Sequence, residues 1–255
     1  MNDPARPLIF SYSAVWDDAA RMLRANAGLL TAIAGVFLFL PALLLAYYVA
    51  EPDPSTGLAE WMESTRAYFR RAGIWLILAS SAQVVGVISV YLLLLGNPRV
   101  TVGRAVATAV SILPFYFIVS FLRVFAVSIG FVLLILPAFY LLGKLTLASP
   151  ILVAETPRAP ISALRASWQR SKGRSIVIAG LLLLIFLMAS LLMLAVQIGI
   201  GSLLLILTDR EGVGGLLVAI LEAATQSAYI LVNITLIAAI YRSIPTGIEL
   251  GKRTG

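Results

Sequence analysis

The chain has 255 residues, of which 60% are hydrophobic and only 12% are charged, and its formal net charge is +7. A soluble domain is nearer half apolar, so this composition indicates several membrane-spanning helices. The absence of Cys and His excludes disulfides and a Ser-His-Asp triad and argues against zinc and iron–sulfur sites, so we expect no metal site and no cofactor. The basic residues lie beside apolar segments, which favours anionic lipid over nucleic acid as their partner.

The apolar segments predict an all-α, polytopic membrane helix bundle that forms a single domain over residues 1–255. A helix needs about 20 apolar residues to cross a bilayer. We place six spans at about 27–49, 72–95, 113–136, 138–155, 174–203 and 215–241. Pro41 interrupts the first span, Pro137 permits a tight reversal before the fourth, and Gly199 and Gly201 predict a break in the fifth.

Short segments with small and apolar residues on one side precede each pair of spans. They cover residues 13–25, 100–112 and 161–172. The first is either a helix in the membrane interface or a plain extension of the first span. An alignment of Ala14, Ala105 and Ala163 predicts three helix-plus-hairpin repeats, although any loop that enters a membrane can look basic and amphipathic.

The basic residues are divided unevenly between the connections. Four of them lie in the loops after the first and fifth spans: Arg66, Arg70, Arg71 and Arg210. Apart from two inside spans, the others lie at the chain ends and in the connections at 96–112 and 155–174. Because Lys and Arg bias short loops toward the cytoplasm, this distribution predicts that both termini are cytoplasmic.

Residues 137–174 carry the most specific pattern in the chain. It consists of Leu136-Pro137, Lys144, Pro150, Glu155, Ala163-Leu164-Arg165, Ser167-Trp168 and Lys172-Gly173. The pattern resembles the membrane domain of some bacterial glycerophosphodiester phosphodiesterases and related stand-alone inner-membrane proteins, which more often have Gly where Ala138 stands. The resemblance implies a multi-pass protein of the bacterial inner membrane. It does not extend to activity, because that family's phosphodiesterase is a separate domain using His and metal-binding carboxylates.

Polar side chains recur inside the predicted spans. The predicted intramembrane polar cluster consists of Arg123, Lys144, Glu222, Gln226 and Asn233. The last three share one helix face with Tyr229, since the spacings are four, three and four residues. Such a face either lines a substrate or headgroup pathway or hydrogen-bonds the helices together.

Counting residues from the ends of the spans predicts partners for these charges. Lys144 and Glu222 both lie roughly 10 Å below the outer face. Opposite charges at one depth relieve each other, so we expect them to share a cluster with Gln226, unless Lys144 snorkels outward. Arg123 lies roughly 15 Å from the cytoplasmic face and is expected to contact Gln83, Gln226 or Glu222.

The segment at 161–172 is predicted to be a basic surface helix. Its lipid-facing residues are Arg165, Trp168, Arg170, Lys172 and Arg174. We expect Trp168 to anchor the helix and the basic residues to contact anionic headgroups, although the ordinary bias of cytoplasmic loops explains the same charges. Glu155 is expected to pair with Arg158 or Arg165, or to cap this helix.

No stretch shows paired carboxylates or a nucleophile beside a base, so we expect no catalytic residues and no enzymatic activity. Two functions stay open. The first is a non-enzymatic membrane protein that supports a membrane-protein partner or organises lipid. The second is a small transporter or flippase-like protein that uses the polar face of the sixth span, and a continuous polar cavity from Arg123 to Asn233 would favour it.

Overall fold

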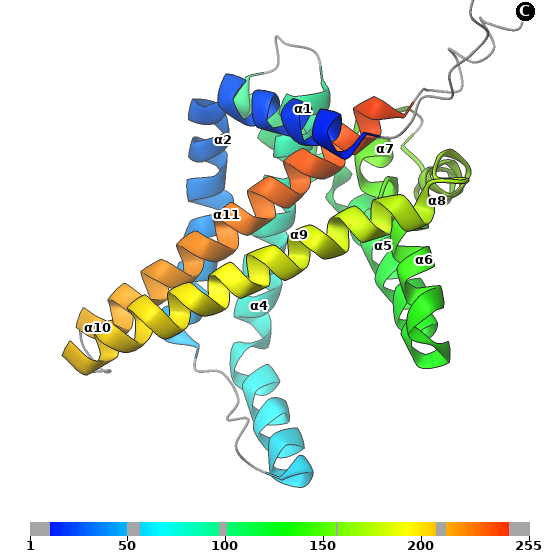
Figure 1. Cartoon of the computed structure of the whole chain (residues 1–255). Coiled ribbons are helices and arrows are strands. Elements are labelled where there is room, and N and C mark those ends of the chain that lie inside the picture. The colour runs from blue at the N-terminus through cyan, green and yellow to red at the C-terminus, as the bar shows by residue number, and fades with distance from the viewer. Residues whose placement is uncertain (1–10, 50–56, 97–100, 157, 208–212, 245–255) are drawn as a thin grey trace, which may run out of the picture.

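The computed structural model describes residues 11–49, 57–96, 101–156, 158–207 and 213–244, and in these ranges every regular element is a helix (Figure 1). Arg99, Arg210 and both chain ends, which entered the orientation argument, lie outside the described residues. The elements are α1 (Tyr12–Ala25), α2 (Ala27–Ala34), the π-helical η1 (Gly35–Phe39), α3 (Leu40–Tyr48), α4 (Leu58–Leu95), α5 (Val102–Leu133), α6 (Ile135–Leu145), α7 (Ala148–Ala154), α8 (Pro160–Arg170), α9 (Ser175–Val196), the π-helical η2 (Gln197–Gly201), α10 (Ser202–Leu207) and α11 (Val213–Ser243).

Six helical stretches among the described residues are long and apolar enough to cross a membrane, which confirms the predicted bundle class. They are Ala27–Tyr48, Ala59–Leu95, Val102–Leu133, Ile135–Ala154, Ser175–Leu204 and Val213–Ser243. Large apolar side chains point outward from them; Val132 is 88% exposed and Leu136 is 81% exposed. An exposed apolar surface of this kind is unfavourable in water and favourable in lipid, so the chain is an integral membrane protein.

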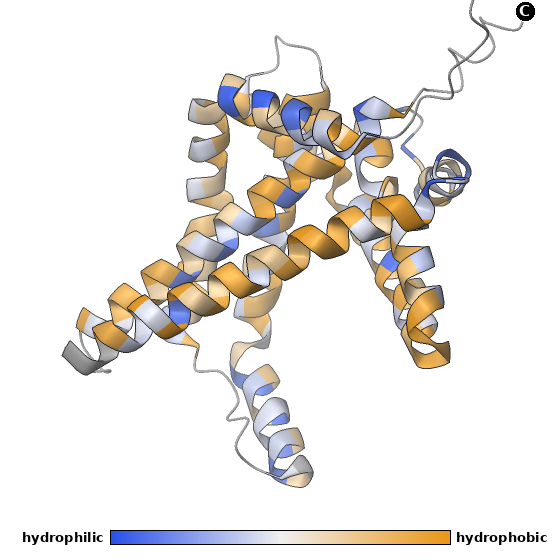
Figure 2. Ribbon diagram, in the orientation of Figure 1, coloured by the Kyte–Doolittle hydropathy of each residue, from blue (hydrophilic) through white to orange (hydrophobic). Residues whose placement is uncertain are grey.

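Figure 2 shows how polarity is distributed along these helices. The polar colours concentrate on α1, on α8 and on the N-terminal part of α4, and apolar colours dominate α9 and the hairpin of α5 and α6. Residues 58–70 continue into the second span as one 38-residue helix. At 1.5 Å per residue this helix is about 57 Å long, so it extends well beyond a hydrocarbon core of about 30 Å.

The second surface helix, predicted at 100–112, is not a separate element. It is the first part of α5, which runs without interruption through Pro114. The three-repeat prediction is therefore wrong in its second copy. The register is also off by one residue, because Ala105 and Ala163 are buried while Ala14 is exposed; Val15 is the first buried residue of α1.

The two predicted interruptions inside spans are π-helical turns. Leu40 N–H donates to the carbonyl of Gly35, which places a wide turn just before Pro41. A wider turn relieves the clash between a proline ring and the preceding turn. In the fifth span, Gly199 and Gly201 lie in η2, so that span continues as a helix.

The hairpin of α5 and α6 reverses at Leu134, three residues before the predicted position. Pro137 instead lies in the first turn of α6, where a missing N–H costs nothing. A Cβ added at Gly130 would lie 2.8 Å from the Ala138 Cα, so the helices approach closely only because this residue is glycine.

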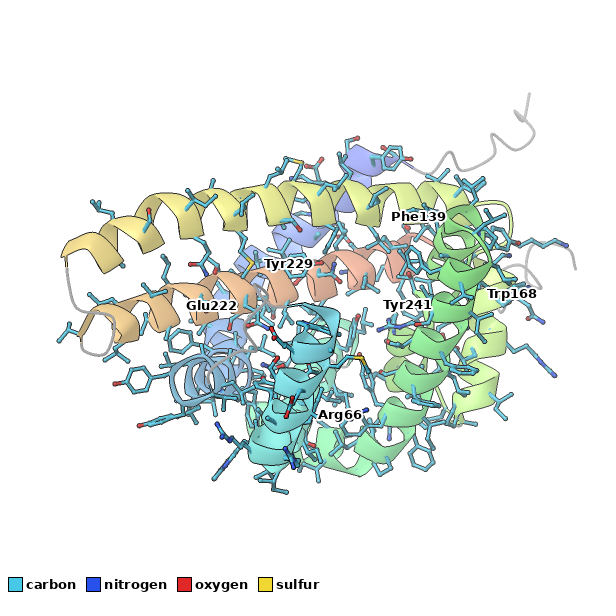
Figure 3. The ribbon with its side chains drawn as sticks, turned by 90° about the horizontal axis from the view of Figure 1, so that it is seen from below. Arg66, Phe139, Trp168, Glu222, Tyr229 and Tyr241 are labelled. Carbon is cyan, nitrogen blue, oxygen red and sulfur yellow. The ribbon has the colours of Figure 1, made fainter. Side chains whose placement is uncertain are left out.

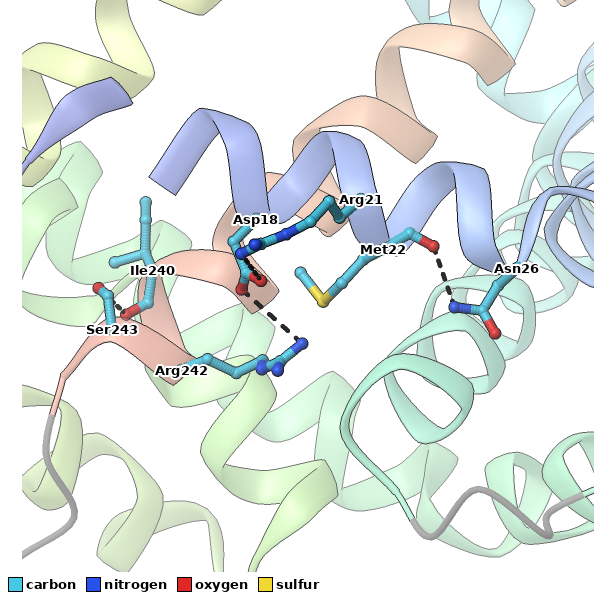
Figure 4. A network of polar contacts seen from close by, with 7 residues as sticks. All are labelled: Asp18, Arg21, Met22, Asn26, Ile240, Arg242 and Ser243. Carbon is cyan, nitrogen blue, oxygen red and sulfur yellow. Dashed lines mark hydrogen bonds and ion pairs between the residues drawn. The ribbon is translucent and has the colours of Figure 1, made fainter. Parts of the chain in front are cut away.

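Helix α1 lies across one end of the bundle and packs against α11 through Val15, Ala19 and Met22 (Figure 1). Figure 4 shows the polar contacts at its edge: Asp18 lies 3.0 Å from Arg21 and 3.7 Å from Arg242 at the end of α11. The start of α1 and the end of α11 are thus on one face, as an even number of spans requires.

Candidate functional sites

Lys144 is the most deeply buried charged side chain among the described residues, with 3% of its surface exposed. Its ammonium group donates a hydrogen bond to the carbonyl of Trp168, at 3.1 Å. The rings of Tyr140 and Trp168 lie 5.5 and 5.1 Å from the same group, so cation–π attraction offsets part of the cost of burial.

The contact between Lys144 and α8 is a reciprocal cap of two helix ends. The last carbonyls of a helix have no partner inside it and carry partial negative charge. Trp168 is in the last turn of α8, so the lysine supplies the donor that its carbonyl lacks. In return, the Ser167 hydroxyl donates to the carbonyl of Lys144 at 2.7 Å, near the end of α6.

Small residues let these helices approach closely. A Cβ at Gly143 would overlap the backbone carbonyl of Ser175 at the start of α9. Ser167, Ser171 and Ser175 are buried at intervals of four residues and face this contact. These small residues were the sequence signal that could have located the contact, since small residues mark close helix contacts in membranes.

The predicted pairing of Lys144 with Glu222 is wrong. Lys144 lies against Trp168, and Figure 3 places Trp168 and Glu222 on opposite sides of the molecule. Lys144 is also too buried to snorkel outward. A residue count along two helices gives only the depth of each side chain in the membrane. Whether two side chains at the same depth meet depends on the direction in which each one points.

Glu155, Arg170 and Tyr241 form the strongest polar network among the described residues. Arg170 donates two hydrogen bonds to the Glu155 carboxylate, at 2.5 and 2.8 Å, and the Tyr241 hydroxyl donates a third at 2.5 Å. This network joins the end of α7 to α8 and α11. The predicted partners of Glu155, Arg158 and Arg165, are therefore wrong.

The network shifts the acidity of its charged members. Partial burial alone would raise the pKa of Glu155, but the hydrogen bonds from Arg170 and Tyr241 and the charge of Arg170 lower it below its ordinary value. The hydrogen bond to Glu155 raises the pKa of Arg170 further above neutrality. Both groups are therefore charged at neutral pH, as a bidentate pair requires.

The remaining residues of the predicted lipid-facing helix differ in exposure. Arg165 and Lys172 are exposed, and Arg174 is partly buried at the turn into α9. Trp168 is 43% exposed and its ring meets Tyr140 edge-on. Arg170 faces Glu155 instead of lipid, so its predicted role in headgroup binding is wrong, and contact of the others with lipid stays a prediction.

The predicted polar cluster does not assemble as one group. Arg123 lies 3.5 Å from the Ser149 hydroxyl on α7, which is the hydrogen bond found for it among the described residues. Glu222, Gln226 and Asn233 lie along α11 and are all partly buried, with Tyr229 on the same helix (Figure 3). Arg123 therefore contacts α7 and Lys144 contacts α8. Of the predicted cluster, only the three residues of α11 share one element.

The largest cavity that we describe was not predicted. It is a groove of about 1050 Å³ between the first span and α4. Its walls are largely apolar and include Phe37, Leu44, Trp75, Leu78, Ala79 and Ala82. Ser64, Tyr68 and Arg71 on α4, and Tyr48 on α3, line its polar end.

The groove lies beside a close contact between the first span and α4. A Cβ at Gly86 would lie 2.7 Å from the Cβ of Phe37, so the two helices nearly touch there. Toward the N-terminal end of α4, alanines such as Ala72 and Ala79 leave space that larger side chains would fill. No local sequence pattern predicts this crossing, which is why the groove was missed.

No family model, no curated protein and no solved structure matches this chain. The resemblance carried by residues 137–174 therefore stays a prediction.

Proposed function

We propose that this integral membrane protein is a non-enzymatic lipid-organising protein, and that the groove between the first span and α4 holds one anionic phospholipid. The single observation that carries the proposal is a 1050 Å³ cavity with apolar walls and a guanidinium group at one end. Pockets for drug-sized ligands occupy about 300–1,000 Å³, so the groove has room for acyl chains.

The depth of Arg71 fits a phospholipid headgroup. Arg71 precedes Leu95, the last residue of α4, by 24 residues, which corresponds to about 36 Å of helix. A hydrocarbon core is about 30 Å thick, so Arg71 reaches the headgroup layer on the side away from α1. A guanidinium group there binds phosphate through paired hydrogen bonds, and tyrosines such as Tyr68 suit the same layer.

The part of the groove between Arg71 and its deep end fits an acyl chain. Eleven residues separate Arg71 from Ala82, the last residue of α4 in the groove lining, and they span about 16 Å. One leaflet is half of a core of about 30 Å, which matches this length. The orientation predicted from the charges makes this the outer leaflet of a bacterial inner membrane.

Native mass spectrometry of the protein purified in its own lipid tests the proposal. The wild-type protein should retain one anionic phospholipid. Ala79→Trp fills the groove and should abolish retention, whereas Ile77→Trp adds the same ring to an exposed position of α4 and should not. Equal retention by the two variants would show that the groove is not the site.

A second pair of variants tests the headgroup contact. Arg71→Gln should lower the preference for anionic over zwitterionic lipid about fivefold, since one basic residue near a membrane contributes about 1 kcal/mol. Arg70→Gln removes a neighbouring exposed charge that does not line the groove. If both variants lose the preference for anionic lipid equally, Arg71 contributes only as part of the general surface charge.

The transporter alternative has less support. Neither of the two cavities that we describe is lined by Arg123, Glu222 or Asn233.

A further inference from the structure

A second cavity lies at the opposite end of α4, near the face that carries α1. It has a volume of about 250 Å³ and lies between the ends of α4 and α7 and the start of α5. Arg104, Thr108 and Arg158 supply its polar lining, and Tyr91 and Gly96 line it from α4. It shares no residue with the groove, so the two sites can be tested independently.

The described residues that line this pocket carry positive charge without a balancing carboxylate. No carboxylate is among the described residues that line it, and neither Arg104 nor Arg158 has an ion pair among the described residues. The nearby carboxylate of Glu155 is already held by Arg170 and Tyr241. Two arginines that line one small cavity repel each other unless an anion lies between them.

The local backbone adds to this potential. Arg104 is in the first turn of α5, which contains no acidic residue. A helix N-terminus carries partial positive charge and favours anions, so a cation there is destabilising. The position of Arg104 therefore lowers the stability of the free helix and raises the affinity of the pocket for an anion.

Arg158 provides an observation that is independent of the helix end. Its Nε is buried and has no hydrogen-bond acceptor within the described part of the chain. A buried donor without an acceptor loses its hydrogen bond to water and gains none in return, so such groups usually have a partner in the functional state. A ligand oxygen in the pocket would supply that acceptor.

We propose that this pocket binds a phosphoryl group, as a small phosphomonoester or as the exposed phosphate of a lipid headgroup. Arginine forks match phosphate oxygens, and a tetrahedral anion can accept from two arginines and a hydroxyl that approach from different sides. The cavity is smaller than the range of about 300 Å³ and above that suits drug-sized ligands, so it excludes a nucleotide.

Calorimetric titration of inorganic phosphate into the full chain in phosphatidylcholine nanodiscs tests this site. The wild-type protein should bind phosphate more tightly than acetate. Arg104→Gln and Arg158→Gln should each weaken binding at least about tenfold, because each removes a charge-assisted hydrogen bond. Arg165→Gln, at an exposed position of α8, should leave binding unchanged. Arg104 is also exposed, so its replacement should not prevent folding.

Phosphatidic acid added to the nanodiscs distinguishes the two sources of the phosphoryl group. If phosphatidic acid weakens the binding of inorganic phosphate in the wild-type protein, a lipid headgroup occupies the pocket. If phosphate binds equally in both discs, the ligand is a soluble phosphate compound. Three results would overturn the proposal: phosphate does not bind in either disc, acetate binds as tightly as phosphate, or the two arginine variants bind phosphate as tightly as the wild-type protein.

Discussion

Removal of the Glu155 carboxylate charge should destabilise the protein by about 2 kcal/mol. The side chains of Arg170 and Glu155 are 20% and 32% exposed, which places the pair between two known limits. An exposed ion pair contributes about 0.2–1 kcal/mol, and breaking a fully buried one costs about 3–5 kcal/mol. Glu155→Gln keeps the shape of the side chain but removes the charge that pairs with Arg170. The expected loss in the free energy of unfolding therefore lies between these two limits.

A thermal melt in detergent measures this effect. A cost of about 2 kcal/mol corresponds to a decrease of about 4–8 °C in the melting temperature for a chain of this size. Tyr241→Phe removes one hydrogen bond and should cost about 1 kcal/mol. The double variant of Glu155→Gln and Arg170→Gln should lose less than the sum of the single changes. Additivity within about 0.5 kcal/mol would refute the coupling.

The pH dependence of the same pair has a definite sign. The pKa of Glu155 is lower in the folded protein than its unfolded value of about 4.3. The carboxylate therefore contributes its full stability above that unfolded pKa and loses it as the pH falls through the lower folded value. The melting temperatures of the wild-type protein and Glu155→Gln should differ most at neutral pH and converge in acid. A difference that persists unchanged in acid would contradict this.

Three further predictions concern packing and topology. Lys144→Met should lower the free energy of unfolding by about 2 kcal/mol in a detergent melt, because it leaves the Trp168 carbonyl without its donor. An unchanged melting temperature would show that this contact does not stabilise the protein. Gly143→Ala should lower the melting temperature more than Gly180→Ala, since a Cβ overlaps the Ser175 backbone only at the first position. Cysteines at Glu63 and Ser162 should react with impermeant reagents from opposite sides of the membrane, and equal labelling from one side would contradict six spans.

The positions of the spans could be predicted because hydropathy is a local property. The spans found begin and end within a few residues of the predicted ones, except where a less apolar segment continues the same helix, at 58–70 and 102–112. Those continuations were missed because a drop in hydropathy indicates where a helix leaves the bilayer, not where it ends. Pro114 did not help, since a proline inside a long membrane helix is tolerated.

The partners of the buried charges could not be predicted in the same way. Depth along a helix follows from residue number, but which neighbour a side chain meets depends on the rotation and crossing of whole helices. Lys144 and Arg123 were both predicted to contact α11 or α4, and both instead contact elements of the segment from α6 to α8. The groove depends on the same crossing geometry, so it was visible only in three dimensions.

Helix α8 is fixed at its two sides by contacts that the sequence presented as surface features. Lys144 and Ser167 tie it to α6, while Arg170 ties it through Glu155 to Tyr241 on α11. A basic helix that only lay in the headgroup layer would have no reason to bury serines or to form a bidentate ion pair with another helix. The inward-facing residues of α8 therefore stabilise the bundle, and its exposed residues, such as Arg165, remain available to lipid in a fixed orientation.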